Sequence, residues 1–331
     1  MKRLIIPIFL AVILILGSLL WWKENSQPVS SDEEMQSFVI PRGYSALQTG
    51  NKLSNQGLIK SSLAFKFYVQ LTAQSKKIQA GEYLLSPSFS LFEIVSQLTK
   101  GPREIWITIP EGLRREEIAN KYLTSLNKTG SEAVEFRQEF LSSTTGKEGY
   151  LFPDTYLFPK TASASAIANK MLSTFDLKID SEMEEAINNS GYNLNQIITL
   201  ASLLERETIT NEERPVVAGI LWKRVEAGWP LQVDAAVQYA IATADCQGKI
   251  ECEWWPILTK EDLAINSSYN TYKYPGLPPA PIASPGLSSI KAAIFPEDSP
   301  YWFYLHDADG EIHYAETLEE HNANVSRYLG K

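Results

Sequence analysis

The feature that most constrains this chain is an uncharged apolar run near its start, from Leu4 to Trp22. Such a run is about long enough to cross the hydrocarbon core of a bilayer as a helix. Lys2 and Arg3 precede it, and positive charge before a span keeps the N-terminus in the cytoplasm. The run is long for a cleaved signal peptide, and no clear cleavage motif ends it. We therefore expect residues 1–22 to be a single-pass anchor in the inner (cytoplasmic) membrane, with the following chain on the extracytoplasmic side.

The remaining chain is long enough for two modest domains or one large one, because the whole sequence has 331 residues. Its net charge of −9 and the lack of a basic stripe argue against a nucleic-acid partner. Residues 23–37, KENSQPVSSDEEMQS, are polar and Ser-rich without periodicity, which predicts a flexible linker. We expect a small module over residues 38–105 and a larger domain over residues 106–331.

Two similar segments mark the starts of these parts, FVIPRG at 38–43 and ITIPEG at 107–112. In each, a β-branched run meets Pro and Gly and is followed by a helical pattern, which predicts a strand, a turn and a helix. The hydrophobic spacing of the first part predicts further elements: helices at 45–56, 61–71 and 90–99, and a strand at 80–86. The predicted fold class is α+β.

The block at 38–105 resembles a LysM-like module, a fold whose helices and short sheet bind glycan chains in other proteins. The alternative is a spacer that holds the following domain at a set height above the membrane. Further on, EGYLFPDTY at 148–156 is predicted to be a loop rather than a regular element. Its aromatic rings suit either stacking on sugars or burial at a domain joint.

The stretch TLASLLERET, at 199–208, places carboxylates on an otherwise apolar helix. Glu205 and Glu207 lie about 200° apart around such a helix, so they point to opposite sides and at most one of them does chemistry. Glu207 lies nearer in angle to Leu200 and Leu203, and a carboxyl against apolar side chains has a raised pKa. A general acid needs that property. The alternative is that both are ordinary solvated charges.

A helix is predicted after this stretch, opened by a capping box between Thr210 and Glu213 and ended by Gly228. The next segment, WPLQVDAAVQYA at 229–240, is predicted to be a strand or loop that returns toward the first helix. It carries Gln232 and Asp234 between apolar neighbours.

A proline-rich segment at 267–286, SSYNTYKYPGLPPAPIASPG, is predicted to be a rigid extended loop. Its amide and hydroxyl side chains, including Asn270 and Tyr272, could line a groove. On composition alone it is also an ordinary proline-rich loop.

Together, ASLLERET, ERPVVAGILWKRVEAGWPLQVDAAVQY, YNTY, GLPPAPIASPG and HYAETLEEHNANV closely resemble the MltG (YceG-like) family of membrane-anchored endolytic murein transglycosylases. The resemblance covers essentially the whole chain. It implies a lyase that cleaves the β-1,4 bond between N-acetylmuramic acid and N-acetylglucosamine inside peptidoglycan glycan strands, leaving 1,6-anhydro ends. It also implies a role as a terminator of glycan elongation beside peptidoglycan synthases. No cofactor or metal is implied.

The family's catalytic glutamate is the second acid of an E-x-E pair, which corresponds to Glu207 here. We expect the substrate to be held by polar groups on the two later segments: Gln232, Asp234, Asn270 and Tyr272. Asp234 could instead act indirectly, by raising the pKa of Glu207, or could cap a turn. Glu205 is expected to form a structural pair with a nearby Arg.

The cysteines and histidines give weaker predictions. Cys246 and Cys252 could close a small disulfide loop in an exported domain, or remain two free buried thiols. The three histidines, His306, His313 and His321, match no metal motif by spacing. The main competing function is a non-catalytic glycan-binding scaffold of the cell wall, and a water-using muramidase ranks after it.

Overall fold

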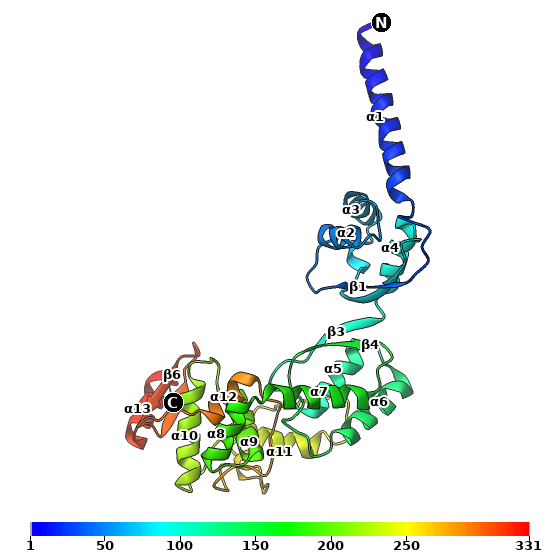
Figure 1. The fold of residues 1–331 in the computed structure, drawn as a ribbon. Coiled ribbons are helices and arrows are strands. Elements are labelled where there is room, and N and C mark those ends of the chain that lie inside the picture. The colour runs from blue at the N-terminus through cyan, green and yellow to red at the C-terminus, as the bar shows by residue number, and fades with distance from the viewer. Residues whose placement is uncertain (1, 331) are drawn as a thin grey trace. The chain divides into compact units, whose positions relative to one another are not determined.

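The computed structural model describes the backbone of residues 2–330 and the side chains of residues 13–330. It is a mixed α+β protein, as the sequence predicts. Two compact units make up the chain (Figure 1). Unit 1 comprises Met1–Ile107 and Tyr156–Ala162, and unit 2 comprises Thr108–Thr155 and Ser163–Lys331.

Unit 1 begins with the long helix α1 (Lys2–Ser26), and a small α+β module follows it. In chain order the module contains β1 (Gln36–Ile40), α2 (Ala46–Asn55), α3 (Ser62–Leu71), a 3₁₀ turn (Ser75–Lys77), β2 (Gly81–Leu85), α4 (Leu91–Lys100) and β3 (Glu104–Thr108). These bounds confirm the helices and strands predicted for this part of the chain.

The module's helices begin where the sequence supplies caps. Ser45 and Gln48 form a capping box at the start of α2, and Ser90 and Glu93 form another at the start of α4. The apolar faces of these helices pack on the sheet around Phe65 and other buried side chains. Because each helix buries a single stripe against the strands, the module has its own core.

The four strands form one sheet in the order β1-β2-β3-β4, and β1–β2 and β2–β3 are antiparallel pairs. The last strand, β4 (Thr155–Pro159), starts inside the segment predicted to be a loop. That prediction is wrong at its C-terminal end. The pairing that makes β4 a strand comes from β3, which lies about fifty residues earlier, so the local sequence gives little sign of it.

The predicted membrane span, 4–22, lies within α1, but the side chains of residues 4–12 are outside the described residues. Among the helices of the described part of the chain, none meets both the length and the apolarity of a membrane span. The helix continues to Ser26, into the predicted linker. The backbone N–H groups of Val29 and Ser30 then donate to the carbonyl of Pro87, so this segment lies along the module.

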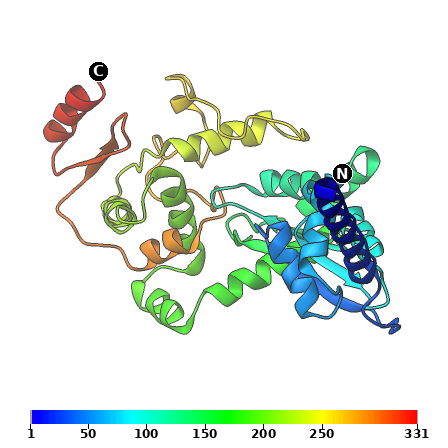
Figure 2. The ribbon, with the colours of Figure 1, turned by 90° about the horizontal axis from the view of Figure 1, so that it is seen from above.

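Unit 2 is mainly helical. Its elements are α5 (Arg115–Ser125), α6 (Gly130–Ser143), α7 (Ala164–Lys178), α8 (Ser181–Ser190), α9 (Leu194–Glu207), α10 (Arg214–Glu226), α11 (Asp234–Asp245), a 3₁₀ turn (Asp262–Ala264), α12 (Leu287–Ile294), β5 (Phe303–His306), β6 (Ile312–Ala315) and α13 (Leu318–Tyr328). Figure 2 shows α13 beside the antiparallel β5–β6 hairpin, with which it is in contact.

Helix α9 lies at the centre of the core of unit 2. Every residue from Ile197 to Leu204 is buried, and α10, α11 and α12 all contact this helix. A helix that is buried on all sides is fixed by its neighbours. Its last turn, which carries Glu205 and Glu207, is therefore held in one place.

Candidate active site

The candidate active site is built on the C-terminal end of α9. The helix starts at a capping box between Asn193 and Gln196 and ends with Glu207, whose neighbour Thr208 is already extended. The end of a helix carries the negative pole of its dipole, which disfavours a negative charge there. Glu207 is therefore placed where its protonated form is favoured.

The two carboxylates of this turn point to different surroundings, as the helical angle predicts. Glu205 receives hydrogen bonds from the Arg214 guanidinium (3.2 Å), the backbone N–H of Gly286 (2.9 Å) and the Ser289 hydroxyl (2.7 Å). The structural Arg pair predicted for Glu205 is thus confirmed. Glu207 instead accepts a hydrogen bond of 3.1 Å from the Tyr304 hydroxyl.

The environment of Glu207 raises the pKa of its carboxyl to about 7. Burial contributes most of this rise, and the negative charge of Asp234 adds to it. The Tyr304 hydrogen bond and the positive charges of Arg224 and Arg206 act in the opposite direction. The side chain is half-buried rather than sealed, so solvent still reaches it. A carboxyl of this kind can both give and take a proton near neutral pH.

Asp234 and Tyr272 lie next to each other near Glu207. The Tyr272 hydroxyl donates a hydrogen bond of 2.5 Å to Asp234, and burial together with this carboxylate raises the pKa of Tyr272. The pair forms because the segments 229–240 and 267–286 are hydrogen-bonded to each other. Thr271 accepts hydrogen bonds from the backbone N–H groups of Gln232 and Val233, through its carbonyl and its hydroxyl.

The predicted strand or loop at 229–240 is a loop only up to Val233, because α11 begins at Asp234. Gln232 has a backbone φ of 57°, which is uncommon for a residue with a side chain, and that side chain is exposed. Strained conformations of this sort cluster at functional sites. The structure thus places Gln232 and Tyr272 on two loops that are hydrogen-bonded to each other, and Asp234 at the start of α11, directly after the first loop.

Asn270 has a different place. Its side chain is fully buried, and its amide donates to the carbonyls of Leu263 and Ile265. Its oxygen accepts the backbone N–H of Tyr272. The amide therefore shapes the loop that carries Tyr272, and it has no exposed atom for the direct glycan contact predicted from the sequence.

Two residues of the site have no signal in the local sequence, Arg224 and Tyr304. Arg224 is buried on α10, and it donates to the backbone carbonyls of Trp302 and Leu231. It thereby ties the strand β5, which carries Tyr304, to the loop that precedes Asp234. Burial and the nearby charge of Glu207 raise the pKa of Tyr304 well above its usual value, so this hydroxyl stays a donor.

The capping box predicted between Thr210 and Glu213 is present only in part: the Glu213 carboxylate accepts the Thr210 backbone N–H, but Thr210 is not the N-cap residue. Glu213 is itself the N-cap residue, and its carboxylate accepts the backbone N–H groups of Ile209 and Thr210, outside the helix. The side chain of Arg214 reaches back to Thr208 and Asn211. These contacts fix the turn after Glu207, and they replace the capping by Thr210.

These side chains all lie within the part of the chain that matches a known family. Residues 38–327 match the model of the YceG-like family. The chain belongs to the YceG-like family. This membership confirms the family predicted from the sequence motifs.

Three proteins with similar sequences or structures match most of the chain. An endolytic murein transglycosylase of Bacillus subtilis is 31% identical, over 95% of this chain and 90% of that protein. An endolytic murein transglycosylase of Streptococcus pneumoniae is 30% identical over 88% of this chain, which spans only 58% of that longer protein. A crystal structure of a YceG-like protein from Listeria monocytogenes is 29% identical, with a TM-score of 0.55 over 88% of this chain and 99% of that one.

A second acid of this YceG-like chain has a strongly raised pKa, but it lies in another environment. Burial raises the pKa of Glu148 to about 8. Its carboxylate accepts the backbone N–H of Arg115 at 3.1 Å, and the Tyr239 hydroxyl lies 3.5 Å from it. Only 6% of the residue is exposed, so Glu148 is far less accessible to a polymer than the half-buried Glu207.

Within the described residues, one group of side chains has the spacing of metal ligands: Asp307, Glu311 and His313. Asp307 accepts backbone N–H groups of the β5–β6 turn and pairs with His313 at 2.9 Å. These bonds close the β5–β6 turn. Cys246 and Cys252 form a disulfide, which decides between the two alternatives that the sequence leaves open.

Proposed function

We propose that this protein is an endolytic murein transglycosylase, a carbon–oxygen lyase that cuts the β-1,4 bond between N-acetylmuramic acid and N-acetylglucosamine within glycan strands. The observation that carries the proposal is the carboxyl of Glu207, held at the end of a buried helix with a pKa of about 7. The names of the Bacillus and Streptococcus relatives support the same reaction.

The first half of the reaction needs an acid. Glu207 donates its proton to the glycosidic oxygen, which leaves as the 4-hydroxyl of N-acetylglucosamine while the bond to the anomeric carbon breaks. A pKa of about 7 suits this step, because much of the carboxyl is protonated at neutral pH yet it still gives up its proton.

The second half needs a base. Glu207, now ionised, takes the proton of the muramic acid 6-hydroxyl as that oxygen attacks the anomeric carbon and closes the 1,6-anhydro ring. The carboxyl regains its proton, and no water is consumed. Glycosidases that use two carboxylates need the second one as a nucleophile or to activate water. Here the sugar supplies its own nucleophile, so a single acid and base is sufficient.

The neighbouring residues have supporting roles in this proposal. Tyr304 orients the carboxyl of Glu207 through its hydrogen bond. Asp234 and Tyr272 form a paired polar edge that holds the glycan, and the exposed amide of Gln232 lies on the loop that precedes Asp234. Asn270 acts indirectly, by shaping the Tyr272 loop.

The products of wild-type protein acting on purified peptidoglycan test the reaction class. Mass spectrometry should find fragments that end in 1,6-anhydro sugars, whose mass is lower by one water than that of reducing ends. Because cleavage is within strands, long glycans should shorten before small muropeptides accumulate. Reducing ends in place of anhydro ends would identify a muramidase, and unchanged strands would favour the scaffold function.

The pH profile of cleavage should report the environment of Glu207. Only its protonated form starts the reaction, so kcat/KM is expected to fall above about pH 7. Tyr304→Phe removes the hydrogen bond that favours the ionised form of Glu207, so the pH at which kcat/KM falls should rise by about 0.5–1. Asp234→Asn removes a negative charge that disfavours the ionised form of Glu207, so the pH at which kcat/KM falls should decrease by a similar amount. Shifts of the same sign in both variants would contradict the assignment.

We further propose that α1 anchors the chain as a single-pass span in the cytoplasmic membrane, with unit 2 on the extracytoplasmic side. The uncharged run from Leu4 to Trp22 supports the anchor, and the disulfide between Cys246 and Cys252 supports an oxidising compartment. An anchored enzyme would meet new strands beside peptidoglycan synthases and end their elongation. The two helices between β1 and β2 support a LysM-like, glycan-binding role for the module, with a spacer as the alternative.

A further inference from the structure

Helix α3 is apolar on two sides. Ala64, Phe65 and Val69 face the core of the module. On another side lies the α3 apolar stripe, made of Leu63, Phe67 and Leu71, whose exposed fractions are 62%, 57% and 73%. These residues are four apart, so they form one continuous row along the helix. A soluble helix normally keeps polar side chains on such a row.

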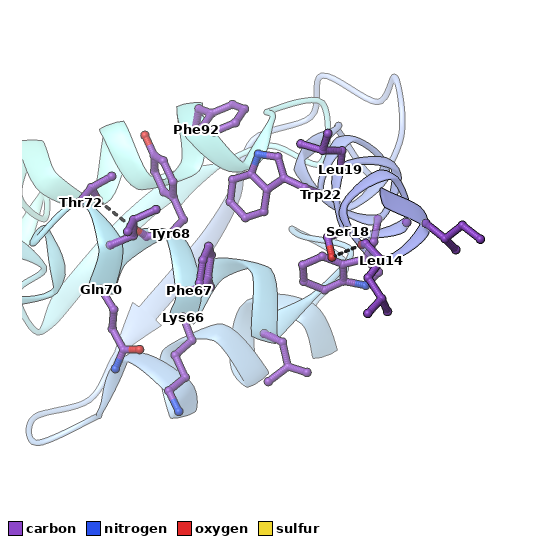
Figure 3. A pocket seen from close by; sticks show the side chains of 15 residues that line it. Leu14, Ser18, Leu19, Trp22, Lys66, Phe67, Tyr68, Gln70, Thr72 and Phe92 are labelled. Carbon is purple, nitrogen blue, oxygen red and sulfur yellow. Dashed lines mark hydrogen bonds between the residues drawn. The ribbon is translucent and has the colours of Figure 1, made fainter. Parts of the chain in front are cut away.

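The α3 apolar stripe forms one wall of a cavity of about 1170 Å³. The opposite wall is the second half of α1, with Leu14, Leu19 and Trp22, and Phe92 of α4 closes the inner end (Figure 3). Among the described residues around this cavity, only Lys66 carries a charge. The lining is therefore suited to a large apolar occupant.

Both walls of the cavity are held together at its inner end. In Figure 3 the ring of Trp22 lies beside those of Phe67 and Phe92. The ring centroids are 6.0 and 6.1 Å from that of Trp22. An ion pair between Lys60 and Glu24 (2.6 Å) adds a second attachment just beyond. The last turns of the apolar part of α1 and the α3 apolar stripe therefore share the same surroundings.

The side chains that line the cavity indicate that its occupant is lipid. The exposed side chains of α1 that line the cavity are apolar except Ser18, whose hydroxyl donates to the Leu14 carbonyl of the same helix. They continue the uncharged run that starts at Leu4. Trp22 and Tyr68 lie together at the inner end, and Trp21 also lines the cavity. Aromatic residues of this type mark the boundary between acyl chains and headgroups. Lys66 lies on α3, like Tyr68, and its long side chain allows the ammonium group to reach lipid phosphates.

We propose that the module is embedded in the membrane interface, with the α3 apolar stripe against the acyl chains of the leaflet that surrounds α1. This inference rests on the proposed anchoring by α1. It makes the module a second membrane contact, so that the chain emerges from the bilayer at a fixed point rather than at the end of a free linker. The bonds from Val29 and Ser30 to Pro87 agree with such a short connection.

Site-specific labels test this contact in the full-length chain. Both native cysteines are in the disulfide, so one added cysteine gives one reactive thiol. We would label Leu63→Cys and Leu71→Cys with an environment-sensitive fluorophore, in vesicles of phosphatidylethanolamine and phosphatidylglycerol. Leu177→Cys is the matched control, since this leucine of unit 2 is 81% exposed. Labels at 63 and 71 should shift to shorter wavelength and be quenched by lipids with quenchers on their acyl chains, and the label at 177 should not.

Several outcomes would overturn the proposal. Labels at 63 and 71 that stay as accessible to water as the one at 177 would show that no lipid covers the stripe. Labels that are shielded from water but not quenched from the acyl chains would show that protein covers it, such as a second copy of the chain. Extraction of the protein by alkaline carbonate would reject the anchor and this inference together. Cleavage of soluble glycan, measured on the same samples, reports separately on the enzymatic function.

Discussion

Glu207→Gln is expected to lower the rate of anhydro-end formation at least about 10³-fold, with the protein still folded. The amide has nearly the shape of the carboxyl and can still accept the Tyr304 hydrogen bond, but it can neither give nor take the proton. Because one group serves both halves of the proposed reaction, its loss removes both. The measurement is the release of anhydro-ended fragments from purified peptidoglycan, with thermal unfolding as the check on folding.

Substitution at this position should make the fold more stable than the wild type near pH 7. The folded state raises the pKa of Glu207 above its usual value, so it favours the protonated form and loses stability as the pH rises toward 7. A neutral amide removes that dependence. Should the variant keep more than about a tenth of wild-type activity, the catalytic proton would have to come from another carboxyl. Glu148 would then be the next candidate.

The choice between Glu205 and Glu207 was accessible from the sequence because it depends on local geometry. A fixed rotation per residue separates their directions on any α-helix, and the apolar neighbours of Glu207 indicate its raised pKa. The elements of the module were accessible for the same reason. Their boundaries follow from capping residues such as Ser45 and Ser90, which act within one turn.

The parts that sequence reasoning missed depend on contacts between distant segments. Tyr304 reaches Glu207 from a hairpin almost a hundred residues later. Asp234 starts a helix rather than a strand because the preceding residues are already paired with Thr271. The side chain of Asn270 is turned into its own loop, which the composition of a proline-rich segment does not reveal. In each case tertiary hydrogen bonds decide what local propensity leaves open.

The opposite result is expected for Glu205→Gln, two residues earlier on the same helix. This change should destabilise the fold by about 3 kcal/mol, since it leaves the buried guanidinium of Arg214 without its charged partner. The side chains of the pair are only 7% and 9% exposed, so water cannot replace the lost interaction. The Glu205 carboxylate also accepts the Gly286 N–H and the Ser289 hydroxyl at the start of α12, where negative charge is favoured by the helix dipole.

Chemical unfolding of Glu205→Gln beside Glu207→Gln measures this difference in stability, because the two variants make the same chemical change on opposite faces of one helix. Folded Glu205→Gln protein should keep the wild-type cleavage rate, because Glu205 does not touch the half-buried carboxyl of Glu207 or its Tyr304 donor. Stability should be partly restored when Arg214→Met is added, since the uncompensated charge is then removed. Loss of cleavage in a fully stable Glu205→Gln protein would instead place the reacting sugar on the α12 side of the helix.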